Sequence, residues 1–255
     1  MKTIKFYVVA ALLAICSSAN AQFTNASSSS SSTSISSEGW SSFFLQYNPS
    51  KVVSDADGAE DLSFTGITAG FSKAFAIAPS TPIYLEAGLA IQYSFATWNW
   101  KDDLKRGRII DTKTGALAAE PEEKFSMFSA KVPVSLTYVW DLPNSSISLA
   151  PFAGVDFRFN AFGSMNTEKN MKNGYTSDDD DWEDTFGKIK KDVFDKKDMG
   201  DDDSTFKRFQ IGWHIGLNAY FNKQYFVGIS YGSDFSEILK KAKVNTTSIT
   251  LGFCF

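Results

Sequence analysis

Residues 245–255 read Asn-Thr-Thr-Ser-Ile-Thr-Leu-Gly-Phe-Cys-Phe, and their side chains alternate strictly between two faces. One face carries Thr247, Ile249, Leu251, Phe253 and Phe255, and the other carries Ser248, Thr250, Gly252 and Cys254. A period of two residues is that of a β-strand. A strand with this composition needs an apolar medium on one side and small or polar groups on the other. Lipid outside a narrow lumen meets both demands.

Seven more segments have the same two-residue period. They span residues 40–47, 64–75, 83–95, 128–140, 147–159, 209–221 and 225–231. The alternation is clearest in 83–95. It is least regular in 40–47, where Trp40 and Phe44 compete with Phe43 for the apolar face. Together with the terminal segment, the pattern predicts an all-β chain of eight strands.

The connections between these segments alternate in length. Three are short and contain Pro, Asn or Asp, as turns do: 76–82, 141–145 and 222–224. Four are long and polar: 48–61, 97–124, 161–205 and 232–243. Short turns on one rim and long loops on the other are typical of an antiparallel, up-and-down transmembrane β-barrel. A soluble β-sandwich does not impose this alternation.

Aromatic residues gather at the ends of the predicted strands, although the chain has 23 Phe residues that could fall anywhere. Those near the short turns are Phe75, Trp140, Phe221, Tyr225 and Phe255, and those near the long loops are Phe64, Phe95, Phe128, Phe159, Phe209 and Tyr231. Two aromatic belts around an aliphatic middle are typical of membrane barrels.

The amino terminus has the pattern of a secretory signal peptide. Lys2 and Lys5 precede the apolar run 6–15, and Ala19-Asn20-Ala21 forms a cleavage site, so we expect removal of residues 1–21. Cys16 allows a lipoprotein signal instead, but Ile15 is too bulky for the small residue that lipidation requires. The mature chain would then keep one cysteine, Cys254, and no internal disulfide.

The mature chain is predicted to have two parts. Residues 22–39 are dominated by Ser, without periodicity, and we interpret them as a flexible lead-in. Residues 40–255 form the predicted barrel. Beyond residue 15 there is no run of 18 apolar residues, and a membrane protein without apolar helices must close its strands into a barrel.

Four stretches resemble the outer-membrane-protein β-barrel domain of small bacterial "porin family" proteins: KVPVSLTY at 131–138, PFAGV at 151–155, RFQIGW at 208–213 and LGFCF at 251–255. The resemblance covers residues 40–255. It implies location in the Gram-negative outer membrane, contact with its lipid and lipopolysaccharide, and insertion by the β-barrel assembly machinery. It also implies that Phe253 and Phe255 belong to the signal which that machinery recognises. It does not specify a function.

Two prolines conflict with a regular closed sheet. Pro133 and Pro151 each remove a backbone donor from a strand interior, and a closed barrel has no edge where that loss is harmless. Since both lie toward the short-turn rim, we expect a local bulge or an irregular rim there.

The inward face of the predicted barrel carries glycine and charge. An eight-stranded lumen is just wide enough to be filled by side chains. Its predicted charged or titratable residues are Glu86, Lys131, Asp156, Arg158, Arg208 and His214. If a turn at 142–145 sets the register, Lys131 faces Asp156 directly. Buried charges need partners, so we expect a network built on this pair and extended by Glu86 and Arg158. We interpret it as a polar plug; a gated conduit or a ligand site is the alternative.

His214 is the only histidine, so any histidine-based catalysis must use it. Some eight-stranded outer-membrane barrels deacylate lipid A with a Ser/His/acid site that faces lipid. His214 shares its inward face with Gly212 and Gly216, and no Ser lies two residues along. We therefore expect a hydrogen-bonded lumen residue and no catalytic residue.

The predicted loop 161–205 is acidic, with 13 Asp and Glu against seven Lys, clustered at 178–181 and 201–203. Such carboxylates could bind Ca²⁺ or other divalent ions, but the spacing of a calcium loop is absent and charged loops are usually solvated. Residues 192–197 could form a short helix. The loop is long enough to recognise an extracellular ligand.

Three functions follow from these observations. The first is a non-enzymatic outer-membrane barrel with a structural or surface-interaction role; the second is a small diffusion channel; the third is a lipid A-modifying enzyme. We expect no cofactor and no metal. A nucleic-acid partner is also not expected, since the composition is 43% hydrophobic with a net charge of only −4.

Overall fold

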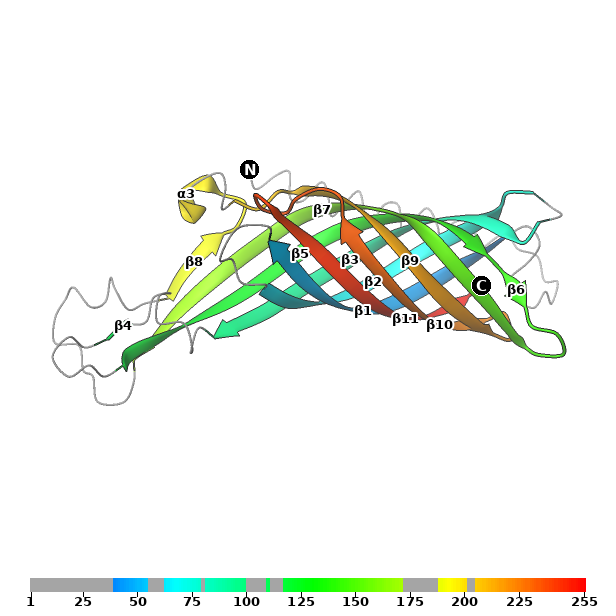
Figure 1. The fold of residues 1–255 in the computed structure, drawn as a ribbon, viewed down its shortest axis with the longest axis horizontal. Helices are drawn as coiled ribbons and strands as arrows, with labels where there is room; N and C mark the ends of the chain where they lie inside the picture. The colour runs from blue at the N-terminus through cyan, green and yellow to red at the C-terminus, as the bar shows by residue number, and fades with distance from the viewer. Residues whose placement is uncertain are drawn as a thin grey trace, which may run out of the picture. The chain divides into compact units, whose positions relative to one another are not determined.

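Eight long antiparallel strands form a closed barrel in the computed structural model of the chain (Figure 1). The structure describes residues 39–54, 62–78, 81–99, 109–110, 117–171, 188–200 and 205–255. The barrel strands are β1 Gly39–Ser54, β2 Leu62–Ala76, β3 Ile83–Asn99, β5 Leu117–Tyr138, β7 Ile147–Met171, β9 Phe209–Phe221, β10 Tyr225–Asp234 and β11 Ala242–Cys254. Each pairs with the next, and β11 pairs with β1 to close the ring. The predicted fold class is therefore confirmed.

Four short elements complete the described part of the chain: β4 Ile109–Ile110, β6 Trp140–Asp141, β8 Lys188–Asp192 and α3 Lys196–Met199. The helix predicted at 192–197 is displaced, because Asp192 still pairs with Ser164 of β7 and a single turn of helix follows the N-cap Asp195. No helix among the described residues is long and apolar enough to cross a membrane. The predicted signal peptide, most of the Ser-rich segment 22–39 and the acidic clusters 178–181 and 201–203 lie outside the described residues.

Strands β5 and β7 continue well past the positions where the sequence predicts loops. Their ladder runs on to Ala119↔Met171, and Figure 1 shows the two strands extending together beyond the others. The boundaries predicted at 124 and 161 are wrong for a physical reason. A polar hairpin that leaves an apolar medium still satisfies its backbone through its partner strand, but it no longer needs the apolar alternation from which strands are predicted.

The outer face of the barrel is apolar and exposed, as the alternation predicts. Ile229 and Leu251, in the middle of their strands, are each 58% exposed. Leaving a large apolar side chain in water costs about 1.5–3 kcal/mol relative to burial, so a face with dozens of such residues is suited to lipid. The aromatic belts are largely confirmed, with one correction. Phe64 is only 6% exposed and packs inward against Phe125, because it has the opposite parity to Ile67.

The two strand prolines do not produce the bulge that we expected. Pro133 pairs in regular register with Asp156 on one side; on the other side the β3–β5 ladder stops at Ala87↔Val134 and resumes at Ala90↔Lys131. The missing N–H of Pro133 is therefore accommodated by an interruption in the β3–β5 pairing that leaves the register unchanged. The bulge lies elsewhere, at Ala161, between the pairs Phe128↔Phe162 and Ser129↔Asn160.

Pro151 lies where the rim is irregular, as expected. It pairs with Leu217 of β9. Opposite it, β5 ends at Tyr138 and Val139 leaves the ladder, donating its N–H to the Pro82 carbonyl instead. The break between β5 and β6 therefore accommodates this proline.

Two clusters of buried apolar residues lie in the lumen, one toward each end. At the short-turn end Trp40 packs edge-on against Tyr84 and Tyr220, at 4.6 and 6.0 Å between ring centroids. At the long-loop end Phe125 lies 5.6 Å from Phe206. The sequence predicted a polar plug, but an apolar cluster lies toward each end, and the buried charged residues Arg158 and Asp234 lie between them.

Residues from the connections between strands contribute to the apolar cluster at the long-loop end. Val193 and Ile238 are almost completely buried there. The Phe206 N–H donates to the Val193 carbonyl at 2.8 Å, and the Lys207 N–H donates to the Ile238 carbonyl at 2.9 Å. Described residues of the predicted loops 161–205 and 232–243, among them Val193 and Ile238, thus supply a lid to the barrel.

Candidate functional site in the barrel lumen

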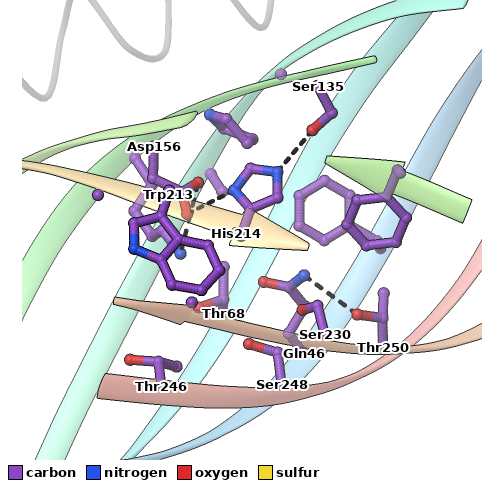
Figure 2. A pocket seen from close by; sticks show the side chains of 18 of the residues that line it. Gln46, Thr68, Ser135, Asp156, Trp213, His214, Ser230, Thr246, Ser248 and Thr250 are labelled. Atoms are coloured by element: carbon purple, nitrogen blue, oxygen red, sulfur yellow. Dashed lines mark hydrogen bonds and ion pairs between the residues drawn. The ribbon is translucent and has the colours of Figure 1, made fainter. Parts of the chain in front are cut away.

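A polar cavity of about 110 Å³ lies between the two apolar clusters. Its walls include Glu86, Lys131, Ser135, Asp156, Arg158 and His214, and Figure 2 shows its side chains converging from several strands. A buried water needs roughly 10–15 Å³ and two to four polar partners. The cavity is therefore large enough for several waters, or for one small polar group.

His214 stands at the centre of this cavity and bridges two strands. Its Nε2 lies 2.7 Å from the Ser135 Oγ, and its Nδ1 lies 2.9 Å from an oxygen of Asp156 (Figure 2). Ser135, Gly154 and His214 occupy one row across β5, β7 and β9. Because Gly154 has no side chain, the serine and the histidine can meet above it.

The predicted ion pair forms, but not with the predicted register. Lys131 Nζ lies 4.0 Å from Asp156, yet Lys131 is opposite Arg158, and Asp156 is opposite Pro133. The ladder is displaced by two residues because the hairpin closes between Leu142 and Ile147, not across 142–145. A two-residue displacement keeps every side chain on its predicted face, so the contact survives as a diagonal one.

Arg158 belongs to a second buried group nearer the long-loop end. Its guanidinium donates to Gln210 Oε1 at 2.9 and 2.7 Å and forms an ion pair with Asp234. Asn160 and Gln210 complete the group, since Asn160 donates to Gln210 Oε1 at 3.0 Å and Gln210 donates to Asp234 at 3.2 Å. All four residues are buried. The sequence analysis missed Asp234, which lies on the inward parity of β10 but beyond the predicted strand end.

Glu86 forms a third group, closer to the short-turn end. Its carboxylate accepts hydrogen bonds from Ser72 and, at 3.5 Å, from Thr137. The single network predicted from the sequence is therefore divided: Glu86 and Arg158 have their own partners and do not extend the Lys131–Asp156 pair.

Arg208 does not enter the lumen, contrary to prediction. It precedes the first residue of β9 and is exposed. Its guanidinium donates to the Ala161 carbonyl at 2.9 Å and to the Asn160 carbonyl at 3.4 Å, and lies 4.3 Å from the centre of the Phe194 ring. The two-residue alternation predicted that Arg208 faces inward. That alternation holds only within a strand, and Arg208 lies just before β9. Its position links the β7 bulge to the segment after β8.

Ser135, His214 and Asp156 have the connectivity of a nucleophile, a base and an orienting acid. Ser135 was not singled out from the sequence, because it lies 79 residues from His214. Two features weaken a catalytic interpretation. Lys131 competes for Asp156, and the serine lies in the lumen between two buried apolar clusters. Within the described part of the chain, no group of three His, Cys, Asp or Glu residues could hold a metal ion.

Comparison with known proteins bears on the fold alone. No protein-family model matches the chain, and no curated protein matches it. Similar solved structures include Ail, the attachment invasion locus protein of Yersinia pestis, in complex with the heparin analogue sucrose octasulfate: 13% identity, 86% of this chain, 99% of that chain, TM-score 0.43. Neisserial surface protein A has 11% identity over 84% of this chain and 97% of its own, with a TM-score of 0.38. The outer membrane enzyme PagL has 12% identity over 81% and 97%, with a TM-score of 0.35.

Proposed function

We propose that this protein is an integral outer-membrane β-barrel without enzymatic activity, whose closed lumen serves as a rigid core and whose long-loop end faces the outside of the cell. The exposed apolar outer face of the barrel supports membrane insertion. Phe253 and Phe255 would then serve as the signal for the β-barrel assembly machinery. The long connections would carry any contact with an extracellular ligand.

The observation that carries this proposal over a channel is the buried apolar cluster toward each end of the lumen. A diffusing solute would have to displace Trp40 and Tyr220 at one end and Phe125 and Phe206 at the other. Ion flow through such apolar constrictions is strongly disfavoured, because they exclude water.

Planar-bilayer recording tests the proposal. We expect the reconstituted wild-type protein to pass no steady current. A Tyr220→Ala, Phe125→Ala double variant removes an aromatic ring from each cluster and should conduct, with its folding verified by heat-dependent gel migration. Trp140→Ala removes an aromatic side chain from the outer face and is the matched control. A steady open-channel conductance in the wild-type protein would favour the channel instead.

A second function is supported by one specific observation, the Ser135–His214–Asp156 arrangement. In this alternative His214 accepts the Ser135 proton while the serine attacks the carbonyl carbon of an acyl group, such as a fatty-acyl ester of lipid A. The ester C–O bond then breaks, the lipid A hydroxyl leaves with the proton from His214, and water hydrolyses the acyl-serine to release the fatty acid. A fluorophosphonate probe tests it directly. Labelling of the folded wild-type protein, lost in both Ser135→Ala and His214→Ala, together with acyl release from lipid A, would establish the enzyme and reject the first proposal. Equal absence of labelling in all three proteins would support the closed barrel.

A further inference from the structure

A second hollow lies on the outer face of the barrel, at the long-loop end. Its volume is about 670 Å³, and the outward side chains around Lys51 that line it are Ser63, Thr65, Thr97, Asn245 and Thr247. We call it the Lys51 groove. Small residues form its floor on β11, β1, β2 and β3, and the larger Tyr231 and Phe95 stand at its two sides.

The groove lies where the apolar face of the barrel gives way to polar residues. Directly next to it, one row across five strands is wholly apolar or aromatic: Ile229, Ile249, Tyr47, Ile67 and Tyr93. Each of these side chains is at least half exposed. Four residues further along the strands, beyond the pair Pro49↔Thr65, Lys51 pairs with Asn245 and Ser63. A ligand that covers both rows must be apolar at one end and polar at the other.

The charge of the groove indicates which polar group fits. Lys51 is exposed within it, and Lys243 lies diagonally across on the same face of β11, two residues beyond Asn245. Diagonal neighbours in antiparallel sheets are in general about 7–8 Å apart at the backbone, and two lysine side chains from such positions can reach one anion. The hydroxyls of Ser63, Thr65 and Thr97 add donors beside them. Phosphate oxygens accept from ammonium and hydroxyl groups together.

We infer that the Lys51 groove binds a phosphate-bearing lipid of the leaflet at the long-loop end. The phosphate contacts Lys51 and Lys243, and the acyl chains lie along the row from Ile229 to Tyr93. This inference rests on the proposed insertion of the barrel into a membrane. It adds a defined lipid site to a surface that would otherwise contact lipid nonspecifically.

Native mass spectrometry of the detergent-solubilised full chain tests the site with a diacyl phosphatidic acid and the diacylglycerol of identical chains. The wild-type protein should retain the phosphatidic acid at least roughly tenfold better than the diacylglycerol, as the loss of one charged hydrogen-bond partner implies. Lys51→Gln should abolish that preference, and Lys243→Gln should reduce it. Lys73→Gln is the control, because Lys73 also lies on the outer face, over the Phe75 ring, but toward the short-turn end.

Three results would overturn the inference: equal retention of both lipids, unchanged retention in Lys51→Gln, or full displacement by inorganic phosphate at equal concentration. Heat-dependent gel migration after transfer into vesicles separates this inference from the proposed function. If the chain inserts but shows no preference for the phosphate, only the lipid site is rejected. If the chain does not insert at all, both the proposed function and the lipid site are rejected.

Discussion

At the scale of single residues, Gly154 determines whether the polar site can form. A Cβ atom added there would lie 2.1 Å from the Val134 carbonyl oxygen and 2.8 Å from His214 Nε2. The Val134 carbonyl oxygen belongs to the backbone, so it cannot rotate away from the added atom. Glycine is thus required at this position by close packing between strands, and not by an unusual backbone conformation.

Gly154→Ala is therefore expected to destabilise the barrel by about 1–3 kcal/mol, as overpacking of an interior does. Gly228→Ala is the matched control. Its added Cβ would mainly meet the Asn218 side-chain amide, which can move. Urea unfolding in lipid vesicles measures both. An equal loss of stability in the two variants would contradict the packing argument.

The buried Arg158–Asp234 pair makes a second prediction at this scale. Asp234→Asn leaves a buried guanidinium without its counter-charge, which costs about 3–5 kcal/mol. The double variant Arg158→Met, Asp234→Leu removes both charges and should recover most of that loss. The exposed pair Lys207–Glu237, at 3.4 Å, provides the contrast. Glu237→Gln should change the free energy of unfolding by less than about 1 kcal/mol.

At the scale of elements, the lid over the long-loop end depends on contacts outside the strand ladders. Arg208 connects the Ala161 bulge to Phe194, and the neighbouring Val193, which belongs to the same lid, is completely buried. Cation–π contacts of this kind contribute about 0.5–2 kcal/mol. That energy is small beside the stability of a barrel but is sufficient to hold a local segment.

Arg208→Ala should therefore loosen the lid without affecting the barrel. Hydrogen exchange of residues 188–200 is expected to accelerate several-fold, while exchange of β9 and β10 stays unchanged. Arg208→Lys keeps the charge but loses the planar fork, so its effect should be intermediate. Uniform acceleration throughout the strands would show that Arg208 stabilises the whole barrel instead.

At the scale of the whole molecule, closure joins the two ends of the sheet. Ser41 and Phe255 exchange two backbone hydrogen bonds, at 3.1 and 2.8 Å, and the Phe255 ring lies 5.9 Å from Phe71. The terminal aromatic therefore has a structural contact as well as its proposed role in assembly.

Phe255→Ala separates these two roles, because it keeps the backbone hydrogen bonds. We expect unassisted refolding into lipid vesicles to proceed nearly as in the wild-type protein, with a loss of about 1 kcal/mol or less from an outward, partly exposed ring. Insertion in cells should fall markedly. If refolding into vesicles and insertion in cells decrease to the same extent, the Phe255 ring acts through stability alone.

The eight strands and, with the exception of Phe64, the faces of the side chains that were assigned within them were predictable, because the two-residue period is a local property. Residues 209–221 were predicted as a strand with the bounds that β9 has. Local alternation also placed Lys131, Asp156, Arg158 and His214 in the lumen. It failed where that periodicity ends, as at Arg208, beyond Tyr231 of β10 and in the outer hairpin of β5 and β7.

By itself, then, the sequence determined a barrel, its inside and its outside, since lipid and lumen impose opposite demands on alternate residues of every strand. Only the tertiary structure decided which inward residues meet. Ser135 reaches His214, and Arg158 reaches Asp234, across 79 and 76 residues of chain. Whether these side chains meet depends on where each hairpin closes, on one bulge and on the final pairing of β1 with β11. They arise only once the sheet is closed.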